Sequence, residues 1–235
     1  MTKLPGLDRS EQIQYTTLAI LSGVVVGMTA LLTHSNSLIF QRFLGELSAP
    51  ITFLFIAILG FLVLSFLLSK ARFFIYKKGC LKELLRFSWL AVLFPIIAIL
   101  VDWKIVFPVD MNIAFPESLL FYSAIGFIVE ILFHVLPFAV LLFSLSLILK
   151  SGSKEKLIWI CILLVATLEP IYQILSMSAY PTWAICATWI NLYLFNLTQL
   201  FLFKKYDFIS MFIFRLVYYL IWHVIWGHLR LELLF

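Results

Sequence analysis

Seven apolar stretches, most of them long enough to cross a lipid bilayer, constrain the fold of this chain more than any other feature. A membrane helix needs about 20 mainly apolar residues to span a hydrocarbon core of roughly 30 Å. The composition agrees, because 63% of the 235 residues are apolar and only 12% are charged. A soluble domain is closer to half apolar and one quarter charged. The stretches are 15–33, 51–69, 87–101, 118–149, 157–176, 182–203 and 208–227.

This pattern predicts an all-α, polytopic integral membrane protein whose main partner is the lipid bilayer. We expect about seven transmembrane helices in a single membrane domain, residues 1–235. The fourth stretch, 118–149, is long for one crossing, since 32 residues form a helix of roughly 48 Å. Pro137 lies inside it, so it is either one bent helix or a crossing followed by a second helix, which would make eight. A soluble globule, a disordered chain and a nucleic-acid-binding module are excluded.

Basic residues predict the orientation in the membrane. With one crossing for each stretch, thirteen Lys and Arg residues lie on the side of the amino terminus and three on the other. Positive residues collect in cytoplasmic loops, so we expect a cytoplasmic amino terminus. The thirteen are Lys3, Arg9, Lys70, Arg72, Lys77, Lys78, Lys82, Arg86, Lys150, Lys154, Lys156, Lys204 and Lys205. The three are Arg42, Lys104 and Arg230.

Ionisable residues inside the later stretches are the candidate functional residues. Glu130 and His134 are four residues apart and share one helix face. Glu169 lies near the middle of the fifth stretch, and Arg215 and His223 lie in the last. Ionisable side chains inside a membrane are costly and rare, so such residues indicate function. If the helices face one another, two carboxylates, two imidazoles and a guanidinium share one site.

Other polar residues have a simpler interpretation. Asn191, Asn196, Gln199 and Tyr219 are expected to form hydrogen bonds between helices, a common role of polar side chains in membranes. Arg230 follows the last apolar stretch, and we expect it at an exposed helix end.

The segment from Gly126 to Phe138 resembles the first motif of the CPBP family, the type II CAAX prenyl endopeptidases and Abi bacteriocin-processing proteases. That motif is E-E-x-x-x-R. Here Val129 stands for the first Glu, Glu130 matches the second and His134 stands for the Arg. The resemblance spans residues 119–227, the half of the chain with the polar core.

Two further motifs of the family have counterparts here. In the second motif, F-x-x-x-H, Val165 stands for the Phe and Glu169 for the His. The third motif, H-x-x-x-N or H-x-x-x-D, aligns in two registers. One places Arg215 at the His position and Tyr219 near the Asn, and the other places His223 at the His position.

The resemblance implies an intramembrane peptidase that acts on a membrane-anchored or lipidated peptide. Glu130 would be the general base that activates water. His134 or His223 would stabilise the oxyanion, and Glu169 would orient one of them or share a proton with Glu130. No cofactor is required in this scheme. A zinc version would use Glu130, His134, Glu169 and His223, but their spacing matches no specific zinc motif.

Two other functions stay open at this point. One is a non-catalytic CPBP relative that binds another membrane protein, with the polar residues fixing helix register. The other, which we rank lower, is a small proton-coupled transporter, because Glu, His and Arg can carry protons. In a bacterium the expected location is the inner membrane. In a eukaryote the resemblance implies an internal membrane such as the endoplasmic reticulum.

Overall fold

The computed structural model describes residues 9–36, 38–148 and 153–235, without the side chains of 81–86 and 88. In this part of the chain the regular structure is helical throughout, as predicted. Six of its helices are long and apolar enough to cross a membrane, so the protein is a membrane protein and the predicted number of about seven is close. These six are α1 (Arg9–Ser35), α3 (Ala49–Ala71), the helix Glu117–Ile148, the segment Lys154–Met177, α9 (Thr182–Lys205) and the helix Phe208–Leu233.

The remaining predicted crossing, 87–101, lies inside α4 (Cys80–Ile105), which is a helix of 26 residues with Pro95 in its interior. Short elements connect the helices at the end away from the amino terminus. They are α2 (Gln41–Leu44), the 3₁₀ turn η1 (Val109–Met111) and the 3₁₀ turn η3 (Leu175–Met177). Among the basic residues used to predict orientation, Lys3 and Lys150 lie outside the described residues.

The long fourth stretch is one continuous helix from Glu117 to Ile148, which decides between the two interpretations of 118–149. It consists of α5 (Glu117–Val129), the π-helical segment η2 (Glu130–Val135) and α6 (Leu136–Ile148). Pro137 is the second residue of α6, two positions after the end of η2, and a proline cannot donate to the carbonyl one turn earlier. The widened π turns therefore precede the proline, and the helix bends without breaking.

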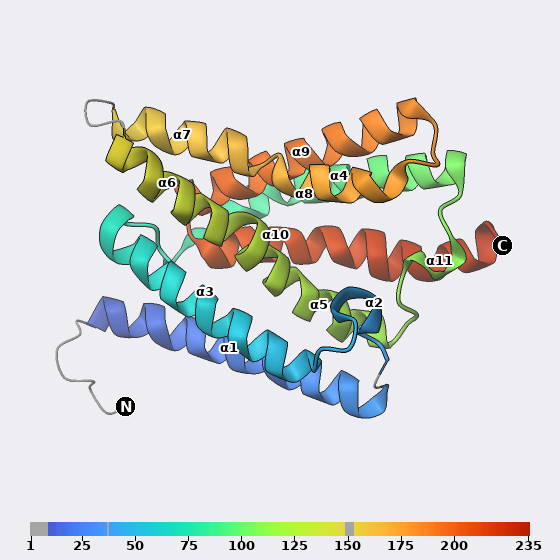
Figure 1. Cartoon of the computed structure of the whole chain (residues 1–235), viewed down its shortest axis with the longest axis horizontal. Coiled ribbons are helices and arrows are strands. Elements are labelled where there is room, and N and C mark those ends of the chain that lie inside the picture. Colours follow the sequence, from blue (N-terminus) through green and yellow to red (C-terminus); the bar gives the residue numbers. More distant parts are fainter. Residues whose placement is uncertain (1–8, 37, 149–152) are drawn as a thin grey trace.

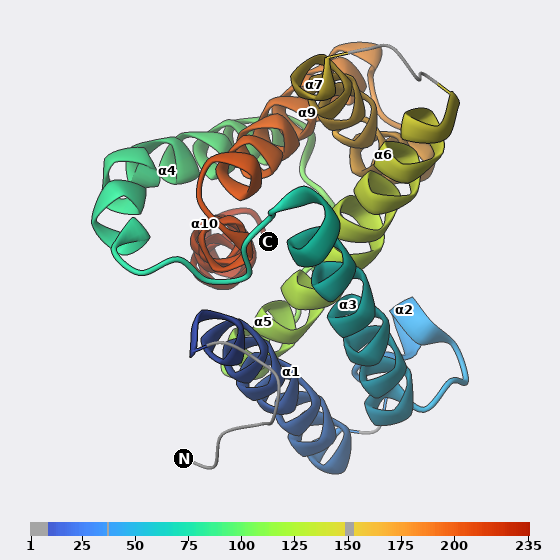
Figure 2. The ribbon, with the colours of Figure 1, turned by 90° about the vertical axis from the view of Figure 1, so that its left-hand side faces the viewer.

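The last helix is the centre of the bundle. It consists of α10 (Phe208–Tyr219), the π-helical segment η4 (Leu220–Trp226) and α11 (Gly227–Leu233). Among the six candidate spans it is the most buried, and α10 contacts α4, α5 and α9. Figure 2 shows α10 surrounded by these helices, with α1 and α3 farther out beside α5. In Figure 1 the start of α1 and the carboxyl-terminal end of the chain lie at opposite ends of the bundle.

The start of α10 is fixed by polar contacts to the segment between α3 and α4. Asp207 is the N-cap, and its carboxylate accepts hydrogen bonds from the backbone N–H of Ser210 at 2.6 Å and of Lys77 at 2.7 Å. On the other side of the same segment, the Gln14 side chain of α1 accepts from the N–H of Ile75 and Tyr76, both at 2.8 Å. These bonds connect α1, the 72–79 segment and α10, and so hold the central helix in place.

The helix formed by α7 (Lys154–Val165) and α8 (Leu168–Ile174) is interrupted at Ala166 and Thr167. Pro170 has no N–H to offer to the carbonyl of Ala166, four residues earlier. The side-chain amide of Asn196 in α9 donates to that carbonyl at 3.4 Å instead. Glu169 thus lies in the first turn of α8, directly after a break that α9 stabilises.

Candidate functional site

Arg215 of α10 is the centre of a buried charged cluster. A guanidinium has five N–H donors, and each of them has a partner here. Nε donates to Glu130 Oε1 at 2.7 Å, and Nη1 and Nη2 donate to the two oxygens of Glu169 at 3.0 and 2.9 Å. The remaining donors reach the Tyr219 hydroxyl at 3.1 Å and Gln199 Oε1 at 2.8 Å. Four helices, α5–η2, α8, α9 and α10, therefore meet at one side chain.

His134 lies between the two carboxylates. Its Nδ1 is 3.1 Å from Glu130 Oε2, and its Nε2 is 3.8 Å from Glu169 Oε2. Among the described residues, Glu130 Oε2 and both ring nitrogens of His134 are buried without a hydrogen bond of good geometry. Buried polar atoms are nearly always paired, and exceptions mark catalytic groups or ordered water. This corner of the cluster is therefore where chemistry can occur.

Glycine and a π-helical turn let the cluster form. A Cβ atom on Gly126 of α5 would lie 3.3 Å from the ring of Tyr219, so the absence of a side chain allows α5 and α10 to approach closely. Glu130 and His134 both lie in η2, the π-helical part of their helix. Single π-helical turns within α-helices are frequent at functional sites.

Gln199 also binds Glu130, because its amide donates to Glu130 Oε1. The same amide contacts the carbonyl of Met211 at 3.4 Å, which fixes its orientation. The sequence identified Gln199 only as an interhelical hydrogen-bonding residue. Its role in the cluster follows from its neighbours on other helices.

The formal charges of the groups in the cluster nearly cancel. Two carboxylates face one guanidinium, which leaves a net charge of −1 when His134 is neutral and zero when a proton is added to the imidazole. Glu130 Oε1 and both oxygens of Glu169 already bind Arg215, whereas Glu130 Oε2 has no hydrogen-bond partner among the described residues. No group of three or more His, Cys, Asp or Glu residues suited to a metal ion is found in the described part of the chain.

His223 lies apart from this cluster, in η4. Its Nδ1 is 2.7 Å from Asn112 Oδ1, and its ring stacks on Tyr122 with centroids 4.2 Å apart. The structure thus brings together Glu130, His134, Glu169 and Arg215 with one imidazole instead of two. Of the two registers for the third motif, the one that uses Arg215 and Tyr219 reaches the carboxylates.

A second buried ion pair lies at the end of the bundle near the carboxyl terminus. Arg230 is 1% exposed, which contradicts its expected position at an exposed helix end. It binds both oxygens of Asp102 in α4, at 2.8 and 3.0 Å, and the carbonyls of Phe107 and Pro108. Trp226 donates to the same carboxylate at 2.7 Å. This pair explains why the last helix continues to Leu233.

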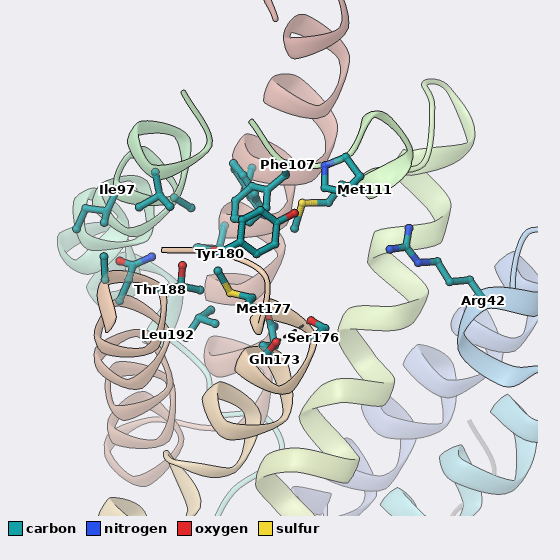
Figure 3. A pocket seen from close by; sticks show the side chains of 17 residues that line it. Arg42, Ile97, Phe107, Met111, Gln173, Ser176, Met177, Tyr180, Thr188 and Leu192 are labelled. Atoms are coloured by element: carbon teal, nitrogen blue, oxygen red, sulfur yellow. Dashed lines mark hydrogen bonds between the residues drawn. The ribbon is translucent and has the colours of Figure 1, made fainter. Parts of the chain in front are cut away.

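A pocket of about 170 Å³ opens at this end of the protein, between α4, η3, α9 and the last helix. Figure 3 shows Phe107, Met111, Met177 and Tyr180 around it, with Arg42 on the far side. Gln173 also lines the pocket, and its amide is 3.4 Å from Glu169 Oε1. Gln173 therefore separates the pocket from the buried cluster. The sequence offered one indication of this role, since Gln173 follows Glu169 by four residues on α8.

No protein-family model matches the sequence, and neither a curated protein nor a solved structure matches it. The class that the fold and the site define is a polytopic helical membrane protein with a charged cluster buried among its central helices.

Proposed function

We propose that this protein is an intramembrane peptidase whose reacting groups are in the Glu130–His134–Arg215 cluster. The observation that carries the proposal is the contact between Glu130 Oε2 and His134 Nδ1 at 3.1 Å, together with the unpaired Nε2 of His134. A carboxylate beside Nδ1 favours the tautomer with the proton on that nitrogen, which keeps the other ring nitrogen free to take a proton. The carboxylate–imidazole pair of serine proteases works in the same way.

The roles we propose differ from those expected from the motifs alone. His134 is the general base, and Glu130 orients its ring. Water that loses a proton to Nε2 attacks the peptide carbonyl, and the same nitrogen returns the proton to the departing amine. Tyr219 accepts a hydrogen bond from Arg215, which leaves its own hydroxyl hydrogen to stabilise the oxyanion. Arg215 compensates one of the two negative charges and fixes the positions of both carboxylates.

Access to the cluster runs through the pocket. Glu130 and His134 are fully buried, so neither water nor a peptide reaches them in this conformation. The contact from Gln173 to Glu169 is long for a hydrogen bond and is the easiest to break. The proposed reaction requires Gln173 to move, after which the pocket extends to Glu169 and His134.

The proposed substrate is a membrane-anchored or lipidated peptide. We also propose that the amino terminus is cytoplasmic. The thirteen basic residues on its side against three on the other support this orientation. The pocket then opens on the opposite side of the membrane.

Peptide cleavage by the purified protein tests the proposal. Wild-type protein in lipid nanodiscs is incubated with a pool of membrane-anchored and lipidated peptides, and new termini are read by mass spectrometry. Loss of a general base typically reduces the rate by about 10²–10⁴-fold. We expect a loss of this size for His134→Ala, with partial recovery when free imidazole is added. His228→Ala is the matched control and retains activity, because His228 is exposed on α11, away from the cluster.

A second candidate is a non-catalytic membrane protein in which the cluster only joins helices. The specific observation in its favour is that all five donors of Arg215 are bound within the protein. This candidate predicts no cleavage by folded wild-type protein under any condition. Equal cleavage by the wild type and His134→Ala would also contradict the proposed peptidase mechanism.

A further inference from the structure

A groove on the surface of the bundle begins between two lysines. Lys70 is in the last turn of α3, and Lys154 is the first residue of α7. Both lysines line one cavity of about 270 Å³, together with residues of α6. The described residues that line this cavity include no Asp or Glu. The mouth of the groove is therefore positively charged and attracts an anionic group.

The charges of the two lysines are not compensated by the protein. Both residues are exposed, and neither has an ion-pair partner among the described side chains. Glu155 follows Lys154 in the chain, but its carboxylate binds Lys204 at 2.7 Å. An anion at the mouth of the groove thus meets two lysines and no competing carboxylate of this segment.

The groove continues along α3 and α6 between apolar side chains. A second cavity, of about 290 Å³, adjoins the first, because Phe66 and Phe143 line both of them. Every residue that lines the second cavity is apolar. Leu62, at its far end, precedes Lys70 by eight residues, which is about 12 Å along the helix. Half of the hydrocarbon core is roughly 15 Å thick, so the apolar part extends from the membrane surface toward the bilayer centre.

We propose that this groove binds one anionic phospholipid. Its phosphate lies between Lys70 and Lys154, and one acyl chain follows the groove past Phe66 and Phe143. Basic pockets between transmembrane helices on the cytoplasmic side bind anionic headgroups in the same way. A zwitterionic lipid with the same chains fits the apolar part equally well but places a second positive group near the two lysines. The groove therefore selects for net negative charge.

The position of the groove in the bundle agrees with a lipid of the cytoplasmic leaflet. The end of α3 and the start of α7 lie at the same end of the bundle as the start of α1 (Figure 1). The proposed orientation places this end in the cytoplasm, where the membrane surface is negative. The lipid site goes beyond the proposed peptidase activity and does not depend on it. Only its assignment to one leaflet depends on the proposed orientation.

Phosphatidylglycerol and phosphatidylcholine with identical acyl chains form a matched pair of probes, because only phosphatidylglycerol has a net negative charge. Purified full-length protein in a neutral detergent is titrated with each lipid, and binding of the first lipid is measured by native mass spectrometry. A basic residue near an anionic lipid corresponds to about fivefold in affinity. We expect the wild type to prefer phosphatidylglycerol. Lys70→Gln combined with Lys154→Gln loses most of this preference.

Matched controls locate the site on the protein. Lys78→Gln combined with Lys156→Gln makes the same change of net charge at exposed positions outside both cavities and keeps the wild-type preference. Val140→Trp fills the apolar part of the groove from an exposed position and weakens binding of phosphatidylglycerol. Val24→Trp, at an exposed position of α1, makes the same change elsewhere and binds as the wild type. Size-exclusion chromatography and thermal melting confirm that each variant is folded.

Glycerol phosphate, the headgroup part without acyl chains, distinguishes a lipid site from a site for soluble phosphate. We expect an excess of glycerol phosphate to leave phosphatidylglycerol bound, because the acyl chain contributes to binding. Displacement of the lipid would assign the lysines to a soluble phosphate and overturn the proposal. Equal binding of the two lipids by the wild type would also overturn it. So would an equal loss of preference in the two double-lysine variants, which would indicate general attraction to a basic surface.

Discussion

Replacing Arg215 by methionine tests whether the buried cluster is held together by its single guanidinium. The change removes five hydrogen bonds and leaves Glu130 and Glu169 buried without a positive partner. Loss of one partner from a buried ion pair costs about 3–5 kcal/mol, because the remaining charge is uncompensated. This corresponds to a decrease of about a hundredfold to several thousandfold in the folded-to-unfolded ratio.

The matched control is Arg42→Met. The Arg42 side chain is 58% exposed, and its nitrogen is 3.9 Å from a carboxylate oxygen of Asp110, itself 78% exposed. An exposed ion pair contributes at most about 1 kcal/mol. Unfolding of both variants is followed by tryptophan fluorescence during titration with a denaturing detergent in mixed micelles. We expect Arg215→Met to shift the midpoint far more than Arg42→Met does.

A third variant separates lost contacts from uncompensated charge. Glu130→Gln and Glu169→Gln are added to Arg215→Met, so that the cluster contains no formal charge apart from that of His134. Neutral amides cost less to bury than carboxylates. We therefore expect the triple variant to recover about half of the stability that Arg215→Met loses. The reasoning is refuted if Arg215→Met and Arg42→Met unfold alike, or if the triple variant is less stable than Arg215→Met.

The remaining predictions concern helix contacts. Gly60→Val lowers the stability of the protein, because a Cβ at this position would lie 2.7 Å from Ile131 Cδ1 in η2, and overpacking costs typically about 1–3 kcal/mol. Gly23→Val changes stability little, since no atom lies within 4 Å of a Cβ at that position; an equal loss for both would contradict the observed packing of α3 on η2. Asp102→Asn leaves the buried Arg230 without a counter-charge. We expect a melting curve in detergent to show a decrease of about 3–5 kcal/mol in the free energy of unfolding. If Asp102→Asn melts at the same temperature as Gly23→Val, the Asp102–Arg230 pair does not stabilise the end of the last helix.

The fold was predictable where hydrophobicity determines it. Runs of apolar residues have one stable arrangement in a bilayer, the helix, so the run 118–149 revealed a membrane-crossing helix without further information. The run alone did not show whether Pro137 breaks that helix, because a π-helical segment accommodates the proline. The run 208–227 likewise did not show that the last helix continues beyond Gly227. That extension depends on Asp102, which lies more than a hundred residues away in the sequence.

The sequence indicated proximity within a helix more readily than contacts between helices. The spacing of Glu130 and His134 places them on one face, and the structure has them in contact. Arg215 and His223 are both ionisable and lie on the same helix, so no sequence pattern placed one inside the cluster and the other outside it. The separation follows from Asn112, a residue of the segment between α4 and α5 that binds His223 at 2.7 Å. A contact of this kind, between residues far apart in the chain, leaves no pattern in the local sequence.

Cleavage in water enriched in ¹⁸O tests the central claim most directly. Purified wild-type protein in nanodiscs is given the membrane-anchored and lipidated peptides, and products are analysed by mass spectrometry. If His134 and Glu130 activate water, each new carboxyl terminus contains one ¹⁸O atom after a single turnover, and Glu130→Gln yields far less product. Absence of new termini from folded wild-type protein, or equal product from Glu130→Gln, would contradict the assignment of this cluster as a peptidase site.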